Sequence, residues 1–575
     1  MLSTKNHPNI LWISLEDTSP RLGCYGDPLA RTPHIDSLAG EGILYRNAFA
    51  TAGVCSPSRS SIITGMYPTY IGAHHMRTSH TNPFAPELPT PYEAVPPPQV
   101  KAFTEYLRAK GYYCSNNTKT DYQFAPPLTA WDENGREAHW RNREPGQPFF
   151  AVFNYDFTHE TCMFGDSFWS RYPGSSLQKE NKPLITDPDQ IEVPPYIPDT
   201  SKSREALARY YDRIGDADEF VGKLLGQLEE DGLSDNTIVF LWSDHGEGLP
   251  RAKRWTYDAG IHVPLIVRWP QVIPGGQVNA ELVSLLDLGP TVLELAGVEV
   301  PCHMQGRPFL CRGPEARRTR EYVFAARDRY DEAYDRVRAV RDKRFKYIRN
   351  YEPLQPYLQW TKFSHHHPMF QELWRLRLRG ELATEQLLFL QNARPVAELY
   401  DCAEDPYEMR NLAGLPEYAE EEERLSAALD EWQAKYDPWG EVPEERMVRL
   451  MWPGGVQPQT APVLYVAING TNPGVEPSPG GFYDEPTAVM LYCATQGASI
   501  AYTMERGGGA IEPADNTERR DRPRWQLYAG PLVLDRPGHT VIRAKAVRIG
   551  YKDSEETVAS YELVVQRAEG EERGG

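Results

Sequence analysis

Short apolar runs alternate with amphipathic segments along the first half of the chain. Four runs are long enough for buried strands: Asn9–Leu15, Phe149–Phe153, Asn236–Trp242 and Pro264–Arg268. Helical spacing of apolar residues predicts a helix over Thr32–Glu41, where Pro33 suits the first turn, and a longer amphipathic helix over Arg204–Asp231. Strands that alternate with helices predict a parallel α/β sheet covered on both faces, with ligands beyond the carboxyl ends of its strands.

The pattern changes after Tyr322. Val337–Val340 and Phe345–Arg349 predict a hairpin, and Glu420–Tyr436 predicts a helix. A Pro- and Gly-rich stretch and then short β runs follow, which indicate a small β-sandwich: Ala488–Cys493, Ile500–Met504, Val541–Val547 and Tyr561–Val565. We therefore expect an α/β domain over residues 1–330, a smaller α+β subdomain over 331–450, a linker over 451–480 and a β-sandwich over 481–575.

Charge and composition narrow the possible partners. The net charge of -19 disfavours nucleic acid or an anionic membrane surface as a partner of the whole chain, although a local site can still bind a small anion. No apolar stretch reaches the length of a membrane span. The apolar run Ile10–Leu15 is too short for a signal peptide, so we expect a cytoplasmic protein; a periplasmic or secreted one is the alternative if a signal has been removed.

The segment Val54–Arg59 combines a cysteine with helix-start signals. Ser56 suits a helix N-cap and Pro57 the first turn, which places Cys55 just before a helix N-terminus. Backbone N–H groups and the helix dipole favour a bound anion there, and Arg59 adds a positive charge. Taken alone, Cys55 is more simply read as a small buried residue than as an activated nucleophile.

Acidic residues follow two of the predicted strands. Glu16 and Asp17 end the first, and Asp244 with His245 ends the third. Carboxylates at neighbouring strand ends are hard oxygen ligands that suit Ca²⁺ or Mg²⁺. His245 leaves Mn²⁺ open as a further choice.

These motifs together resemble the formylglycine-dependent sulfatases. Cys55–Arg59 followed by Thr64-Gly65 resembles the signature CxPxR…TG, whose cysteine a formylglycine-generating maturation enzyme oxidises in that family. NILWISLED resembles the family's first strand, which usually ends in Asp-Asp, so Glu16 is a departure. Asp244-His245 resembles the second metal pair. The resemblance implies an alkaline-phosphatase-like α/β/α sandwich and a divalent cation, with calcium as the first choice.

The resemblance also implies further site residues. Lys119 takes the place of the lysine in the family's Gly-Lys-x-His stretch, and Asp121 stands where that stretch has histidine. His159 resembles the histidine near the leaving group, and Lys253 has the spacing to Tyr257 of a sulfate-binding lysine. The implied catalytic set is Cys55, Arg59, Lys119, His159 and Lys253, with Asp121 as an additional substrate contact.

The resemblance extends over roughly residues 8 to 440. The stretches VPPYIPDTSKSREALARYYDRIGDAD, LYDCAEDPYEMRNLAG and KYDPWG look most like the heparan N-sulfatases (sulfamidases), which implies a sulfate ester or sulfamate of a sulfated amino sugar as substrate. The region after Gly455 lies outside it. There, GASIAYTME and the following segment resemble the fibronectin-III-like modules of some bacterial carbohydrate enzymes.

Two other functions remain open at this stage. The first is a phosphonate monoester or phosphodiester hydrolase on the same scaffold, since a fold does not fix the reaction. The second is a non-catalytic protein that binds glycans. We expect substrate specificity to reside in the loops 76–94 and 351–370, and we interpret the run His365–His367 as a partly exposed loop.

Overall fold

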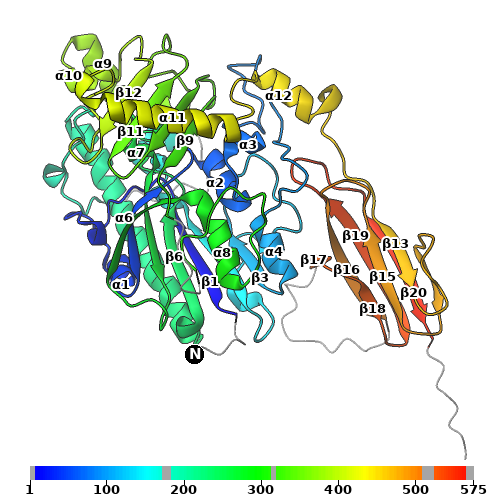
Figure 1. Cartoon of the computed structure of the whole chain (residues 1–575). Helices are drawn as coiled ribbons and strands as arrows, with labels where there is room; N and C mark the ends of the chain where they lie inside the picture. Colours follow the sequence, from blue (N-terminus) through cyan, green and yellow to red (C-terminus); the bar gives the residue numbers. More distant parts are fainter. Residues whose placement is uncertain (1–6, 171–182, 312–318, 508–523, 565–575) are drawn as a thin grey trace, which may run out of the picture.

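The computed structural model describes residues 7–170, 183–311, 319–507 and 524–564 (Figure 1). Its largest sheet has the strand order β4-β3-β5-β1-β6-β7-β2-β8. The bounds are β1 Asn9–Leu15, β2 Ile43–Phe49, β3 Tyr113–Asn117, β4 Glu133–Asn134, β5 Phe149–Tyr155, β6 Thr237–Ser243, β7 His262–Arg268 and β8 Gln277–Ser284. The four predicted strands are therefore present.

The sheet is mixed. β1, β3, β5 and β6 run parallel, as predicted, but β7 pairs antiparallel with both β6 and β2. A parallel return to the sheet needs a crossover of a dozen or more residues, usually a full helix. Between β6 and β7 the only α-helix of the described chain is α7, Asp258–Ile261, so the prediction of an all-parallel sheet was wrong for β7.

Helices cover both faces of this sheet, which gives the expected α/β/α sandwich (Figure 1). Alternate side chains of β1 point to opposite faces of the sheet. Trp12 packs in one hydrophobic core with Phe103 and Phe150, whereas Ile13 packs in the other with Leu207 and Ile214. The helices are α1 Pro33–Gly40, α2 Cys55–Thr64, α3 Pro68–Ile71, α4 Phe103–Ala109, α5 Asp166–Trp169, α6 Ser201–Glu230 and α8 Leu288–Ala296.

A smaller antiparallel sheet, β12-β11-β10-β9, follows with α11 packed on it through Leu425, Leu429 and Trp432. Its first strand begins at Val323, earlier than the expected boundary at 331, because β9 pairs with β10 along its whole length. The elements are β9 Val323–Arg327, β10 Val337–Arg341, β11 Phe345–Asn350, β12 Ala397–Asp401, α9 Pro368–Arg379, α10 Thr384–Leu388, α11 Ala419–Tyr436 and α12 Glu444–Met451.

The C-terminal part is a two-sheet β-sandwich, with sheets β13-β15-β18 and β14-β20-β19-β16-β17. Its strands are β13 Leu464–Ile468, β14 Gly480–Tyr483, β15 Thr487–Tyr492, β16 Ser499–Gly507, β17 Gln526–Leu527, β18 Leu532–Leu534, β19 Gly538–Val547 and β20 Thr557–Leu563. β13 lies inside the expected linker 451–480, because Tyr465 and Ala467 alternate into the sandwich core. The last residue of the predicted run Tyr561–Val565 lies outside the described residues.

The sandwich packs beside α4 of the catalytic domain (Figure 1). Lys101 Nζ donates to the carbonyl of Gly497 at 3.1 Å, and Arg108 Nη2 donates to the carbonyl of Trp525 at 2.8 Å. No described helix is long and apolar enough to cross a membrane.

Candidate active site

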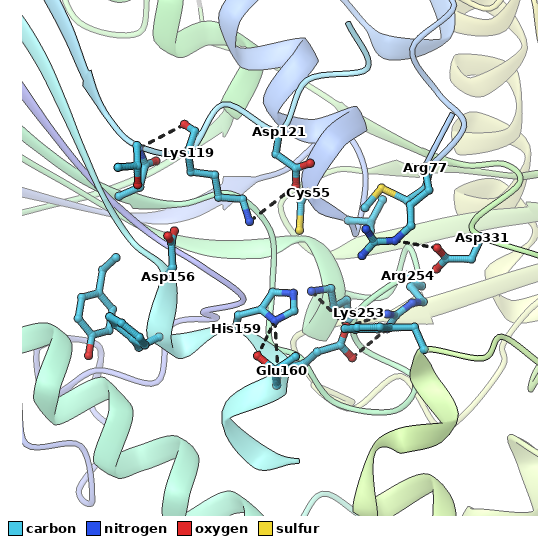
Figure 2. A pocket seen from close by; sticks show the side chains of 18 of the residues that line it. Cys55, Arg77, Lys119, Asp121, Asp156, His159, Glu160, Lys253, Arg254 and Asp331 are labelled. Carbon is cyan, nitrogen blue, oxygen red and sulfur yellow. Dashed lines mark hydrogen bonds and ion pairs between the residues drawn. The ribbon is translucent and has the colours of Figure 1, made fainter. Parts of the chain in front are cut away.

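A cavity of about 1160 Å³ opens beyond the carboxyl ends of β1, β5 and β6, at the N-terminus of α2 (Figure 2). The sequence-predicted residues that line it are Cys55, Lys119, Asp121, His159 and Lys253. The remaining ones, Glu16, Asp17, Arg59, Asp244 and His245, are buried directly behind it. The structure thus brings all ten predicted residues to one place.

Cys55 is the first residue of α2, and the expected cap is wrong in detail. Val54 occupies the N-cap position and makes no side-chain cap. The Ser56 hydroxyl instead donates to Asp121 Oδ1 at 3.0 Å. Burial raises the pKa of the Cys55 thiol, although Lys253 and Lys119 act against this. An unmodified Cys55 is therefore a protonated thiol at neutral pH and a poor nucleophile.

The two acidic pairs meet because β1 and β6 are parallel neighbours, with Leu15 opposite Ser243. Oxygen atoms of Glu16, Asp17 and Asp244 lie within 4.8 Å of one another. His245 Nε2 lies 3.1 Å from Asp17 Oδ1 and 3.4 Å from Cys55 Sγ. The side chains predicted as metal ligands therefore surround one point beside the thiol.

Three cations compensate these three carboxylates. Arg59 Nε donates to Asp244 Oδ2 at 3.0 Å, Lys253 Nζ lies 2.9 and 2.8 Å from the Asp17 oxygens, and Lys119 Nζ contacts Glu16 Oε1. Burial raises the pKa of Glu16 to about 8 despite the contact with Lys119. Burial alone would also raise the pKa of Asp17, but Lys253 and the nearby histidines hold it well below its usual value.

The residues fit a hard divalent cation. Glu16 Oε2 is buried and has no hydrogen-bond partner within the described structure, although a buried carboxylate oxygen normally has one. One of the two Glu16 carboxylate oxygens lies in the cluster that Glu16, Asp17 and Asp244 form. Buried, closely spaced carboxylates of this kind are suited to calcium or magnesium, and the His245 imidazole adds a nitrogen donor.

His159 follows β5 and points one ring nitrogen toward the cavity (Figure 2). Thr161 N donates to Nδ1 at 3.3 Å, so the neutral ring carries its proton on Nε2. Burial and the positive charge of Lys253 lower the pKa of His159 to about 3. The neutral ring can therefore donate an N–H to a group in the cavity.

Several lining residues were not predicted from the sequence. Asp156 and Glu160 flank His159, and Arg254 follows Lys253, so their position next to predicted residues was an available signal. Arg254 Nη2 donates to Glu160 Oε1 at 2.6 Å. Arg77 and Asp331 also line the cavity and pair at 2.9 Å. Arg77 belongs to the loop 76–94 that the sequence analysis proposed for substrate specificity, whereas Asp331 comes from a loop that carries no local signal.

Aromatic rings form one wall of the cavity, with Phe363, Phe168 and Trp169 among its lining residues. The predicted loop 351–370 supplies Phe363. Within the histidine run, the expectation of an exposed loop was wrong for His367. That side chain is fully buried, because Nδ1 accepts from Met369 N at the start of α9 and the ring packs on Phe164.

The fold and site define an alkaline-phosphatase-like hydrolase with a divalent-cation site. Comparison with known proteins gives its family. The Sulfatase family model matches residues 8–135 and 133–298, and the model of the N-sulphoglucosamine sulphohydrolase C-terminal region matches residues 246–366. The chain belongs to the sulfatase family and is a sulfuric ester hydrolase. Membership of this family implies a metal ion and a formylglycine in general terms.

Individual relatives agree with this assignment. An ulvan-active sulfatase of Formosa agariphila is 39% identical over 96% of this chain and 91% of its own length. The human N-sulphoglucosamine sulphohydrolase is 28% identical over 76% of this chain and 92% of its own. A solved 2-O GAG sulfatase superposes with a TM-score of 0.54 at 21% identity, covering 76% of this chain and 93% of that one, which supports the fold alone.

Proposed function

We propose that this sulfatase removes sulfate from a sugar residue of a sulfated polysaccharide, with ulvan as the first substrate to test. Supporting this is the ulvan-active relative, whose similarity extends over 96% of the chain and so includes the region of the β-sandwich. A second candidate is N-sulfoglucosamine. The N-sulphoglucosamine sulphohydrolase model favours it, since its match over residues 246–366 contains Lys253, Asp331 and Phe363 of the cavity.

The observation that carries the proposal is the charge distribution around Cys55. Three buried carboxylates are matched by Arg59, Lys119 and Lys253. A divalent cation among the carboxylates would leave an excess of about two positive charges, which equals the charge of a departing sulfate dianion. Fixed positive charge in a site of low dielectric constant stabilises the charge that develops on sulfuryl oxygens.

We assign calcium to the cluster of Glu16, Asp17, Asp244 and His245. Such a cation would lower the pKa of a hydroxyl bound to it and polarise a sulfuryl oxygen. Calcium is preferred because three of the four donors are carboxylates, the hard oxygen ligands that this ion takes. Magnesium and manganese are the alternatives.

We further propose that Cys55 is oxidised to formylglycine by a maturation enzyme that supplies the oxidant. The hydrated aldehyde provides a hydroxyl nucleophile and, afterwards, a way to expel sulfate. In the folded chain Cys55 is only 2% exposed, so the maturation enzyme must reach it before the chain folds. The raised pKa of the thiol supports the need for this modification.

The remaining residues act on charge and protons. Lys119 and Lys253 line the cavity on both sides of Cys55, where they contact sulfuryl oxygens, and Arg59 holds Asp244 in place from behind. The neutral ring of His159 donates a hydrogen bond from Nε2–H to the leaving oxygen or nitrogen of the sugar, which stabilises the negative charge that develops on that atom. Asp121, which Ser56 anchors, accepts a hydrogen bond from a sugar hydroxyl.

A substrate panel tests the proposal. Sulfate release from ulvan oligosaccharides and from D-glucosamine 2-N-sulfate would be measured by ion chromatography, and 4-nitrophenol release from 4-nitrophenyl phenylphosphonate by absorbance. The three substrates would be compared by kcat/KM. We expect ulvan to be the best substrate. A preference for the N-sulfate would favour the second candidate, and a preference for the phosphonate would contradict both.

A further inference from the structure

Arg77 occupies an unusual position at the mouth of the active-site cavity. It lines the same cavity as Cys55, yet it belongs to the loop that follows α3 rather than to a strand end (Figure 2). Its backbone φ is 57°, in the left-handed region that few residues other than glycine adopt. Strained conformations of this kind persist where the surrounding structure holds them, and they are frequent at binding sites.

The surrounding contacts hold Arg77 firmly. Arg77 Nε lies 2.9 Å from Asp331 Oδ1, and Asp331 is itself in the left-handed region with φ 51°. The two loops are joined next to this pair, because Met76 N donates to the carbonyl of Arg329 at 2.9 Å and Arg329 Nη1 donates back to the carbonyl of Met76 at 3.0 Å. The guanidinium is therefore anchored at its Nε edge.

The other edge of the guanidinium is available to a ligand. Asp331 is the one ion-pair partner that the described structure gives to Arg77, and the Arg77 side chain remains 46% exposed. Figure 2 shows its terminal nitrogens directed into the cavity, on the side of Cys55. An arginine that is fixed at one edge and open at the other suits bidentate recognition of a planar or tetrahedral anion.

Phe363 connects this arginine to the reacting centre. The Arg77 guanidinium carbon lies 5.4 Å from the Phe363 ring centroid, and the His159 ring lies 6.2 Å from the same ring. Phe363 therefore lies beside both residues. Because His159 is assigned to the leaving group, an anion on Arg77 would belong to the sugar part of the substrate and not to the sulfate that is cleaved.

We propose that Arg77, positioned by Asp331 and Phe363, is a specificity-determining residue that binds a second anionic group of the substrate. That group is a carboxylate or a second sulfate on the sulfated sugar or on its neighbour. This inference rests on the proposed function, since it assumes that a sulfated sugar occupies the cavity. It makes the enzyme selective for polyanionic saccharides over singly sulfated ones.

Direct binding to full-length protein tests this inference without turnover. Every protein in the experiment carries Cys55→Ala and is titrated by calorimetry with two matched pairs of probes. One pair is ulvan oligosaccharides before and after reduction of their uronate carboxylates to alcohols. The other pair is D-glucosamine 2-N,6-O-disulfate and D-glucosamine 2-N-sulfate. The pair that shows the preference identifies the anion as carboxylate or sulfate.

We expect the more anionic member of at least one pair to bind about tenfold or more tightly, and Arg77→Ala to abolish that difference. Arg77→Lys keeps the charge but not the two-pronged donor, so it should retain only part of the preference. Arg141→Ala is the matched control, because that arginine is also ion-paired and 42% exposed but lies outside the cavity lining.

The inference is overturned if the two members of each pair bind equally tightly. It is also overturned if Arg77→Ala keeps the difference in affinity, as the control Arg141→Ala does. Failure of the proposed function looks different. In that case the protein with an intact Cys55 releases no sulfate from any saccharide of the panel, while the Arg77-dependent difference in binding persists.

Discussion

Removal of the divalent cation should lower the free energy of unfolding, and the affinity of the site for the cation should depend on pH. At a calcium concentration one hundred times the Kd, one site stabilises the folded chain by about 2.7 kcal/mol. For a domain of this size that corresponds to a rise in Tm of about 3–4 °C over the chelated protein. Differential scanning fluorimetry with calcium added back after chelation measures this rise.

Glu16 supplies the sharper part of this prediction. Burial raises its pKa to about 8, so below pH 8 a proton competes with calcium for its carboxylate. The contribution of Glu16 alone should weaken calcium binding about fifteenfold between pH 8 and pH 6.5. Asp17 and Asp244 do not contribute to the pH dependence of calcium binding in this range, because the pKa of each is lowered and both stay ionised. The pKa of His245 is raised, so a proton on His245 also competes with calcium.

The variant Glu16→Gln isolates that contribution. Glutamine has nearly the same shape and no proton to lose, so the slope of log K for calcium against pH should fall by about one below pH 8. Isothermal titration calorimetry at several pH values provides the slopes. An unchanged slope in Glu16→Gln, or a Tm that does not respond to calcium in the wild type, would refute the placement of the cation.

Three further predictions concern other parts of the molecule. His159→Gln should lower kcat for a sugar sulfate by about 10² to 10⁴. It should lower kcat for 4-nitrophenyl sulfate by less than about tenfold, because a nitrophenolate leaves without a proton. Equal losses for the two substrates would contradict the role of His159. Burial lowers the pKa of His367 to about 4, so the stability that this residue contributes should fall by about 3 kcal/mol as the pH falls from 6.5 to 4. Urea unfolding at each pH should therefore show a wild type that loses about 3 kcal/mol more than His367→Asn over this range, and equal pH dependence in the two proteins would be inconsistent with the buried neutral ring. Gly497→Ala should weaken the contact between the β-sandwich and the α/β domain, because the φ of Gly497 is 77° and a Cβ there would lie 2.0 Å from the Pro98 carbonyl. Limited proteolysis should release the sandwich faster, while activity toward an aryl sulfate is retained. An unchanged cleavage rate would contradict this contact.

Local patterns predicted the elements that position the site. β1 appears at its predicted residues, and α6 differs from its predicted bounds by a few residues. In both cases the spacing of apolar residues is unambiguous, because β1 is buried on both faces and α6 buries a single stripe of side chains. The pairing of Glu16-Asp17 with Asp244-His245 could likewise be expected, since the two strands that carry them are parallel neighbours.

What the sequence could not predict depends on contacts between distant segments. Ser56 has the sequence signature of a helix cap, yet Asp121 competes for its hydroxyl from 65 residues away. The direction of β7 depends on how the loop after Asp244 returns to the sheet. Arg77 and Asp331 form one pair only because their loops meet over the cavity, and neither residue stands in a motif.

The state of Cys55 tests the central claim most directly. Trypsin releases it in the peptide of residues 47–59, NAFATAGVCSPSR, whose mass changes as the side chain loses sulfur and two hydrogens and gains one oxygen. Preparations made with different levels of the maturation enzyme would be compared for the fraction of converted peptide and for sulfate release from the same sample. The account predicts that specific activity is proportional to the converted fraction and that Cys55→Ala is folded but inactive. Full activity in a sample whose Cys55 is entirely unmodified would contradict it.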